Sequence, residues 1–245
     1  MSVKKDIRIL TLDEILKFCE THSLPNFRAK QIWEWLWKKR VTSFEKMTSL
    51  TKETRELLNT KFSLNTIKMH KAEKSLDGTI KYSFRLHDNL LVEGVLIPSK
   101  KRLTACISSQ VGCSLDCKFC ATGTLKLERN MTTGEIYDQV FILNQEAISN
   151  FERPISNIVY MGMGEPLLNY KAVLNSIDFI TGEQGLGMSP RRITVSTAGI
   201  AKMIKNLGDD AVKFNLAISL HAASDSKRNL LMPLNEKINL LNLRE

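Results

Sequence analysis

The sequence has 245 residues and lacks any run of 18 apolar residues, so it offers no candidate for a transmembrane helix. Its first ten residues, MSVKKDIRIL, carry charge but lack the apolar stretch of a secretory signal peptide. We therefore expect a cytoplasmic protein without membrane association, in which thiols stay reduced and disulfides do not form. Low-complexity segments are also absent, and an apolar content of 43% predicts a globular fold.

Cysteine is scarce, and its placement is uneven. The chain has five cysteines, and four of them lie between Cys106 and Cys120. Three have the spacing Cys113-x₃-Cys117-x₂-Cys120, which allows them to converge on one inorganic centre. Three thiolates are one fewer than a closed zinc or iron–sulfur site usually takes. An iron–sulfur cluster held here would therefore keep one iron free for a small molecule.

Two plainer interpretations of the cysteines are open. A structural zinc site can be built from Cys106 together with the other three thiols, although zinc sites usually have two separated C-x₂-C pairs and this sequence has one. Spacing and context together favour iron–sulfur. The fifth cysteine, Cys19, lies in the helical pattern LDEILKFCE and is expected to be a small buried residue without chemistry.

Basic residues outnumber acidic ones, and the formal net charge is +9. Residues 1–70 alone carry fourteen lysines and arginines against eight aspartates and glutamates. A basic surplus of this size indicates a polyanionic partner, most simply RNA or DNA.

The N-terminal quarter is helical in pattern, with apolar residues spaced by three and four over 10–24, 26–40 and 49–62. All three tryptophans lie in the second of these segments. We expect a small helical core with a solvated basic end at Lys38, Lys39 and Arg40, and this end is also a candidate phosphate contact.

A β-hairpin is predicted next, because 78–86 and 90–98 are rich in β-forming residues and are joined by the turn His87-Asp88-Asn89. Glu93 shares one strand face with apolar neighbours. Either this face is exposed at a sheet edge, or Glu93 lies in a pocket that raises its pKa and lets it move protons. The pattern alone favours the exposed edge.

From residue 103 onward strands and helices alternate. Strands are predicted at 103–112, 156–166, 191–199 and 212–222, and helices at 132–148, 168–180 and 201–208. The first helix opens with Thr132-x-x-Glu135, a capping-box pattern. Strands with nearly continuous apolar runs predict a parallel sheet, open or barrel-like.

Polar and metal-binding groups follow each predicted strand, at the edge where ligands bind in such folds. These groups are the cysteine loop, Gly164 with Glu165, Ser196, and Ser219 with His221. Each also has a plainer interpretation: a glycine turn, an ordinary strand-end serine, or a histidine that makes a structural hydrogen bond. Their common position on one rim indicates a ligand site.

The stretches ACISSQVGCSLDCKFCATG, VYMGMGEPLLN, RRITVSTAGI and LAISLHA resemble the RlmN/Cfr family of radical S-adenosylmethionine (SAM) RNA methyltransferases. The resemblance covers essentially the whole chain. It implies an α/β fold: a partial (βα) radical SAM barrel preceded by a small helical domain and a β-hairpin extension. The expected domains are an RNA-contacting helical domain at 1–68, the hairpin extension at 69–99 and the radical SAM core at 100–245.

The resemblance also implies residue roles. Cys113, Cys117 and Cys120 match the ligands of a 4Fe–4S cluster whose open iron binds SAM, and reduction of that cluster cleaves SAM to a 5′-deoxyadenosyl radical. Cys106 matches the second catalytic cysteine, which releases the product by forming a disulfide, and Glu93 matches the proton acceptor. The positions that match SAM contacts are Gly164, Glu165, Ser196, Ser219 and His221.

In this family the radical takes hydrogen from a methyl group carried on a cysteine near the C-terminus, and the resulting carbon radical adds to adenine. A cofactor radical is needed because C2 of adenine is too weakly nucleophilic for polar methyl transfer. The sequence looks more like the RlmN branch, which methylates C2 of adenosine in 23S rRNA and in some tRNAs. The expected partners are therefore 23S rRNA, tRNA and an external electron donor, and the expected state is a monomer.

The sequence departs from the family at its end, since it stops at Glu245 and has no cysteine after Cys120. We expect a C-terminally truncated chain with an incomplete barrel, which can build the cluster site but cannot complete a methylation cycle. Two alternatives are a radical SAM enzyme that uses its deoxyadenosyl radical directly and a non-catalytic zinc- and RNA-binding fragment.

Overall fold

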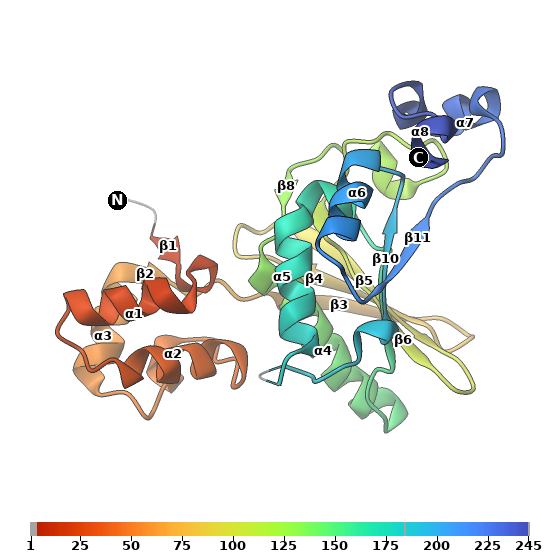
Figure 1. Cartoon of the computed structure of the whole chain (residues 1–245). Coiled ribbons are helices and arrows are strands. Elements are labelled where there is room, and N and C mark those ends of the chain that lie inside the picture. Colours follow the sequence, from red (N-terminus) through yellow and green to blue (C-terminus); the bar gives the residue numbers. More distant parts are fainter. Residues whose placement is uncertain (1–3, 184, 245) are drawn as a thin grey trace.

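Figure 1 shows the computed structural model, which describes residues 4–183 and 185–244. A group of helices at the N-terminus lies beside a mixed sheet, and two long helices, α4 and α5, pack along that sheet. The N-terminal helices are α1 (Leu12–Thr21), α2 (Phe27–Trp37) and α3 (Lys52–Lys61). The short strands β1 (Lys5–Asp6) and β2 (Phe62–Ser63) pair in parallel and join the two ends of this group.

The main sheet has seven strands in the order β11-β10-β9-β6-β5-β4-β3 among the described residues. The strands are β3 (Lys68–Lys74), β4 (Ile80–Arg85), β5 (Leu91–Pro98), β6 (Leu103–Cys106), β9 (Asn157–Tyr160), β10 (Ile193–Thr197) and β11 (Asn215–Ile218). The helices that follow the strands are α4 (Thr133–Phe151), α5 (Tyr170–Thr181), α6 (Ala201–Asp209), α7 (Asp225–Leu231) and α8 (Leu240–Arg244).

Strands β6, β9, β10 and β11 run parallel, whereas β3 to β6 pair antiparallel. The predicted α/β fold with a partial (βα) barrel is confirmed. The carboxyl ends of the parallel strands meet at one edge of the sheet, which is where βα folds place their ligands. Along β4, β5, β9 and β10 one sheet face is buried, and the other carries half-buried and exposed side chains.

The predicted hairpin is confirmed as β4 and β5, which pair from Ile80↔Leu96 to Arg85↔Leu91. Asn89 adopts a positive φ of 66° in the turn, which asparagine tolerates better than most residues. No sequence pattern predicts β3, because all seven of its side chains are exposed and show no apolar alternation. The pairing of β5 with β6, which makes the hairpin continuous with the core sheet, is also not apparent from the sequence.

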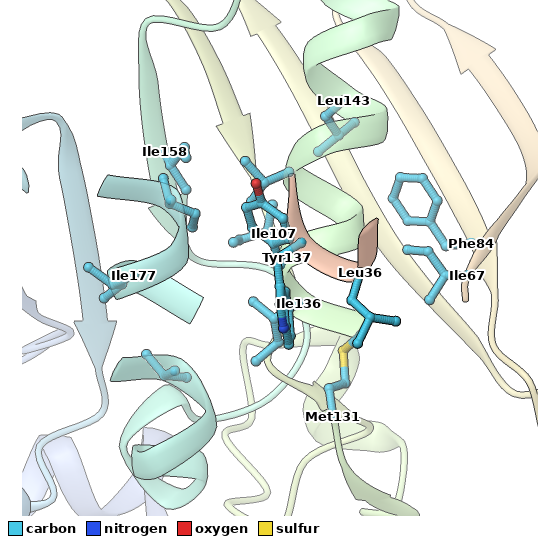
Figure 2. Close-up of a cluster of buried hydrophobic side chains, with 14 of the residues drawn as sticks. Leu36, Ile67, Phe84, Ile107, Met131, Ile136, Tyr137, Leu143, Ile158 and Ile177 are labelled. Atoms are coloured by element: carbon cyan, nitrogen blue, oxygen red, sulfur yellow. The ribbon is translucent and has the colours of Figure 1, made fainter. Parts of the chain in front are cut away.

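The predicted N-terminal helices form, and their apolar side chains join the main core. Ile32, Leu36 and Trp37 of α2 are buried, and so is Cys19 of α1. The Trp37 ring stacks on Phe179 of α5 with centroids 3.8 Å apart. Figure 2 draws Leu36 in one buried cluster with side chains of the sheet and of α4 and α5. The helical part therefore shares a core with the sheet and does not build one of its own.

The expectation of a solvated basic end after α2 is wrong for Arg40. Its side chain is buried and forms an ion pair with Asp138 of α4, which also accepts a 2.9 Å bond from Arg8. The Arg40 guanidinium lies over the Phe141 ring at 3.9 Å. Arg40 is consequently an anchor between the N-terminal part and α4 and is not a free phosphate contact.

No described helix combines the length and apolar character needed to cross a bilayer.

The predicted capping box at the start of α4 is confirmed: Thr132 Oγ1 accepts from Glu135 N at 3.2 Å, and Glu135 accepts from Thr132 N at 2.9 Å. Replacing Thr132 with alanine leaves the Glu135 N–H without its side-chain acceptor. We expect the free energy of unfolding to fall by about 1 kcal/mol, measured by urea denaturation. An unchanged midpoint would show that the cap does not stabilise α4.

Candidate functional site

The cysteine loop follows β6, and a two-stranded ribbon closes it. Strand β7 (Gln110–Val111) pairs antiparallel with β8 (Arg129–Asn130), so the two ends of the loop are held together. Gly112 at the loop entrance has a φ of +77°, and a Cβ there would lie 1.9 Å from the carbonyl oxygen of Lys126. Only glycine fits this close approach. No sequence pattern predicts this ribbon, because its strands are only two residues long.

Within the loop, backbone hydrogen bonds fix the three cysteines. Cys120 N donates to Cys117 O at 3.1 Å, and Cys113 N donates to Leu125 O at 3.4 Å. A Cβ on Gly123 would lie 2.6 Å from the Cys117 carbonyl oxygen, so the turn after the cysteines also needs glycine. Cys113 is buried, whereas Cys117 and Cys120 are half-buried.

Seven of the ten predicted site residues line one cavity of about 250 Å³. They are Cys113, Cys117, Cys120, Gly164, Glu165, Ser196 and Ser219. The two serines come from neighbouring strand ends, and their hydroxyl oxygens lie 3.4 Å apart. His221 does not line the cavity. Its ring packs against that of Phe119 with the ring centroids 3.8 Å apart, and Phe119 does line the cavity. Glu93 and Cys106 lie outside the cavity.

The SSQ stretch before the cysteines holds the glycine-rich loop after β9. Ser109 N and Gln110 N both donate to Met163 O, and Gln110 Oε1 accepts from Glu165 N at 2.7 Å. Gly164 has a φ of +94°, and a Cβ there would lie 2.4 Å from Gln110 Cβ. Gly164 is therefore required by close packing as well as by its backbone conformation. The sequence alone assigns no role to this motif, because its hydrogen-bond partners lie far away along the chain.

Glu165 is buried, and both of its carboxylate oxygens accept backbone hydrogen bonds. Leu167 N donates to Oε1 at 3.0 Å, and Ala198 N donates to Oε2 at 2.7 Å. Burial raises the pKa of this carboxyl, and the backbone donors lower it. The family resemblance implied a SAM contact at Glu165. In the structure the carboxylate ties the loop after β9 to the loop after β10.

When the thiols in this cavity ionise, their negative charges repel one another and the carboxylate of Glu165. Burial is the main cause that raises the pKa of Cys117, to about 11, and the neighbouring thiolates and Glu165 add to it. The pKa of Cys113 is raised by burial and by the same kind of neighbours. A bound cationic centre removes this repulsion, because coordination favours the thiolate. The donor set therefore fits an iron–sulfur cluster.

The zinc alternative needs one ion to be reached by Cys106 and the loop thiols together. In the described ranges, no three His, Cys, Asp or Glu side chains are arranged to hold one metal ion. Cys106 lies on β6, away from the cavity that the three loop cysteines line. A cubane differs in its demands, since each thiolate binds a different iron. Cys106 is therefore not placed with the loop thiols, as the zinc site would require.

Glu93 and Cys106 lie on the same face of the sheet, the one that carries half-buried and exposed side chains (the open face), where Glu93 is half-exposed and Cys106 is buried. Val95 pairs with Cys106, and because β5 runs antiparallel to β6, Glu93 lies toward the carboxyl-end rim. Ser108 Oγ donates to the Glu93 carbonyl at 2.6 Å and accepts from Met163 N at 2.8 Å, which links this strand to the glycine-rich loop. The Glu93 side chain is 51% exposed and pairs with Lys81 at 3.3 Å. The side chain is exposed, as the sequence pattern favoured, but the expected edge position is wrong, because β5 lies between β4 and β6 in the sheet.

Cys106 is expected to react slowly with alkylating reagents at neutral pH. Burial raises the pKa of its thiol to about 11, so about one molecule in a thousand carries the thiolate at pH 8. In the cluster-free protein, the modification rate at Cys106, read by peptide mass spectrometry, should rise about tenfold per pH unit between pH 8 and 10. A rate that levels off below pH 9 would contradict the buried, neutral thiol.

Two family models match the chain. Residues 6–64 match the model described as "Ribosomal RNA large subunit methyltransferase N-terminal domain", and residues 107–240 match "Radical SAM superfamily". The second match spans the cysteine loop and all the strand ends that line the cavity. Fold and site together therefore define a radical SAM protein, a class that uses a 4Fe–4S cluster and SAM.

More specific relatives narrow this class. A "Probable dual-specificity RNA methyltransferase RlmN" from Cytophaga hutchinsonii is 56% identical over 99% of this chain and 66% of its own length. The relative of the same name from Flavobacterium psychrophilum is 54% identical over 99% of this chain and 70% of its own. The chain belongs to the RlmN family of radical SAM RNA methyltransferases, and it spans about two thirds of the length of these relatives.

A solved structure agrees with this assignment. The crystal structure of a radical SAM methyltransferase from Sphaerobacter thermophilus matches with a TM-score of 0.85 at 37% identity. The match covers 98% of this chain and 70% of the Sphaerobacter chain.

Proposed function

We propose that this chain binds a 4Fe–4S cluster and SAM and acts in the methylation of C2 of adenosine in 23S rRNA and in tRNA. The observation that carries the proposal is the single cavity in which three loop thiols meet Gly164, Glu165, Ser196 and Ser219. The words "dual-specificity RNA methyltransferase" in the names of the relatives support two kinds of RNA substrate. The basic N-terminal region supports RNA as the partner.

Cys113, Cys117 and Cys120 would hold the cluster, which when bound supplies the electron that splits SAM into methionine and a 5′-deoxyadenosyl radical. Ser196 and Ser219 offer hydroxyl groups to SAM, and His221 closes the same rim behind Phe119. Glu165 holds two strand-end loops in register around the cavity. An external electron donor would reduce the site.

Glu93 and Cys106 would serve the RNA side of the reaction. Glu93 stands on the open face near the rim, and its half-exposed carboxylate can accept a proton from the adenine. Cys106 is held as a neutral thiol one strand away, which suits a group that reacts only after a base or a partner thiol activates it.

The test is anaerobic reconstitution with iron and sulfide, followed by addition of SAM and a chemical reductant. We expect a brown protein that releases 5′-deoxyadenosine, detected by chromatography and mass spectrometry. RNA binding is measured in parallel by fluorescence anisotropy with a 23S rRNA fragment, a tRNA and a DNA duplex of matched length. A colourless zinc-loaded protein that leaves SAM intact would overturn the cofactor part of the proposal, and equal affinity for DNA would overturn the RNA part.

A further inference from the structure

Arg228 lies on α7, the short helix that follows β11, and its side chain is fully buried. Its guanidinium donates to the backbone carbonyls of Ala198 at 2.6 Å and Leu220 at 3.2 Å, and to the side-chain oxygen of Asn235. All three acceptors are neutral. A buried guanidinium is costly unless its donors are satisfied, so this set of bonds is strongly specified.

The two backbone acceptors belong to the strand ends that line the cavity. Ala198 follows β10, and its N–H donates to Glu165 at 2.7 Å while its carbonyl accepts from Arg228. The Ala198 backbone is thus clamped between a buried carboxylate and a buried guanidinium. Leu220 lies between Ser219 and His221, the two candidate SAM contacts after β11. One side chain therefore fixes two of the loops that form the site.

The helix that carries Arg228 also holds the cysteine loop. Lys118 N, inside the Cys117-x₂-Cys120 turn, donates to Leu231 O at 2.9 Å. The next residue, Met232, lines the cavity, and its N–H donates to the Arg228 carbonyl at 2.7 Å. Fixing Arg228 consequently fixes the wall that faces the thiols.

Arg228 also brings charge to the site. Its guanidinium donates to the carbonyl of Ala198, and Ala198 lines the cavity together with the three thiols. A buried positive charge near a cluster stabilises the more negative, reduced form and so raises the reduction potential.

We propose that Arg228 is a positioning residue of the SAM site, which sets the loops after β10 and β11 and the α7 wall against the cysteine loop and supplies a buried positive charge beside the cavity wall. This inference rests on the proposed cluster and SAM function. Two properties of the guanidinium are separable: lysine keeps the charge without the three directed bonds, and methionine keeps bulk without either.

The test compares R228K and R228M with wild type and with K227M, which changes the exposed neighbour on the same helix. In the cluster-free chain, amide hydrogen exchange is measured over 196–200, 217–222 and 114–120. Exchange in all three segments should accelerate at least about tenfold in R228K and R228M and stay at the wild-type rate in K227M. After reconstitution, the dissociation constant for SAM should rise at least about tenfold in both Arg228 variants.

The reduction potential separates positioning and charge from a merely structural role. We expect R228K to keep a potential near that of wild type and R228M to shift to a lower potential. The proposal is overturned if both Arg228 variants have the amide exchange rates, the SAM dissociation constant and the reduction potential of K227M. It is also overturned if R228K and R228M have the same reduction potential. Wild type that takes up no cluster would overturn the proposed function instead, while the exchange comparison in the cluster-free chain still decides the role of Arg228.

Discussion

Replacing Cys117 with serine is expected to abolish cluster binding and SAM cleavage. Loss of an outer hydrogen-bond partner of a metal ligand typically costs about 10–100-fold, and loss of one of three ligands should cost at least about a hundredfold. Serine keeps the shape of the side chain in the half-buried turn but binds iron far more weakly than a thiolate. Iron and sulfide content per chain and the rate of 5′-deoxyadenosine formation measure the effect.

Cys19→Ala is the matched control, because Cys19 is buried in α1 and lines none of the cavity. It should keep the full iron content. A Cys117→Ser protein that retains the wild-type iron content and cleavage rate would show that the cluster, if present, is held elsewhere.

Replacing Asp138 with alanine is expected to lower the free energy of unfolding by about 3–5 kcal/mol. Asp138 on α4 lies between two buried guanidiniums, Arg8 and Arg40, and its second oxygen accepts from Ile67 N at 3.3 Å. Without the carboxylate, two buried guanidiniums lose the ion-pair partner that they share at the contact between the N-terminal part and α4. Urea denaturation followed by tryptophan fluorescence measures the loss.

The exposed residue Asp209 at the end of α6 provides the comparison. Asp209→Ala should change the free energy of unfolding by less than about 0.5 kcal/mol. If Asp138→Ala costs less than about 1 kcal/mol, then the ion-pair cluster is not what fastens the helical part to the sheet.

The alternating strands and helices after residue 103 could be predicted, because short segments rich in β-branched residues, such as NIVY and ITVST, alternate with helical patterns. Strand β3 could not, since its residues KMHKAEK are all exposed and it forms only by pairing with β4. The anchor between Arg40 and Asp138 joins residues 98 positions apart, which no local pattern reveals. The basic run from Lys38 to Arg40 suggested a solvated end, but the fold buries the Arg40 side chain in an ion pair.

The site residues also fall into those that a local pattern predicts and those that only long-range contacts define. The cysteine spacing and the glycine-rich strand end are local patterns, and the structure brings them to one cavity. Gln110 and Arg228 carry no such pattern, because each acts on backbone atoms of other strand ends. The only local signal for Arg228 is a charged residue directly before the apolar segment NLLMP, which follows a predicted strand. Its partner carbonyls are set by the tertiary fold alone.

If three loop thiolates hold a cluster with one iron open toward the SAM-binding rim, then SAM should change the magnetic properties of that cluster. Electron paramagnetic resonance of the reconstituted, reduced protein, recorded with and without SAM, measures this change. We expect about four irons and four sulfides per chain, a reduced-cluster signal, and a change in that signal when SAM occupies the open iron. A cluster signal that is identical with and without SAM, or a chain that binds one zinc and no cluster, would contradict this expectation.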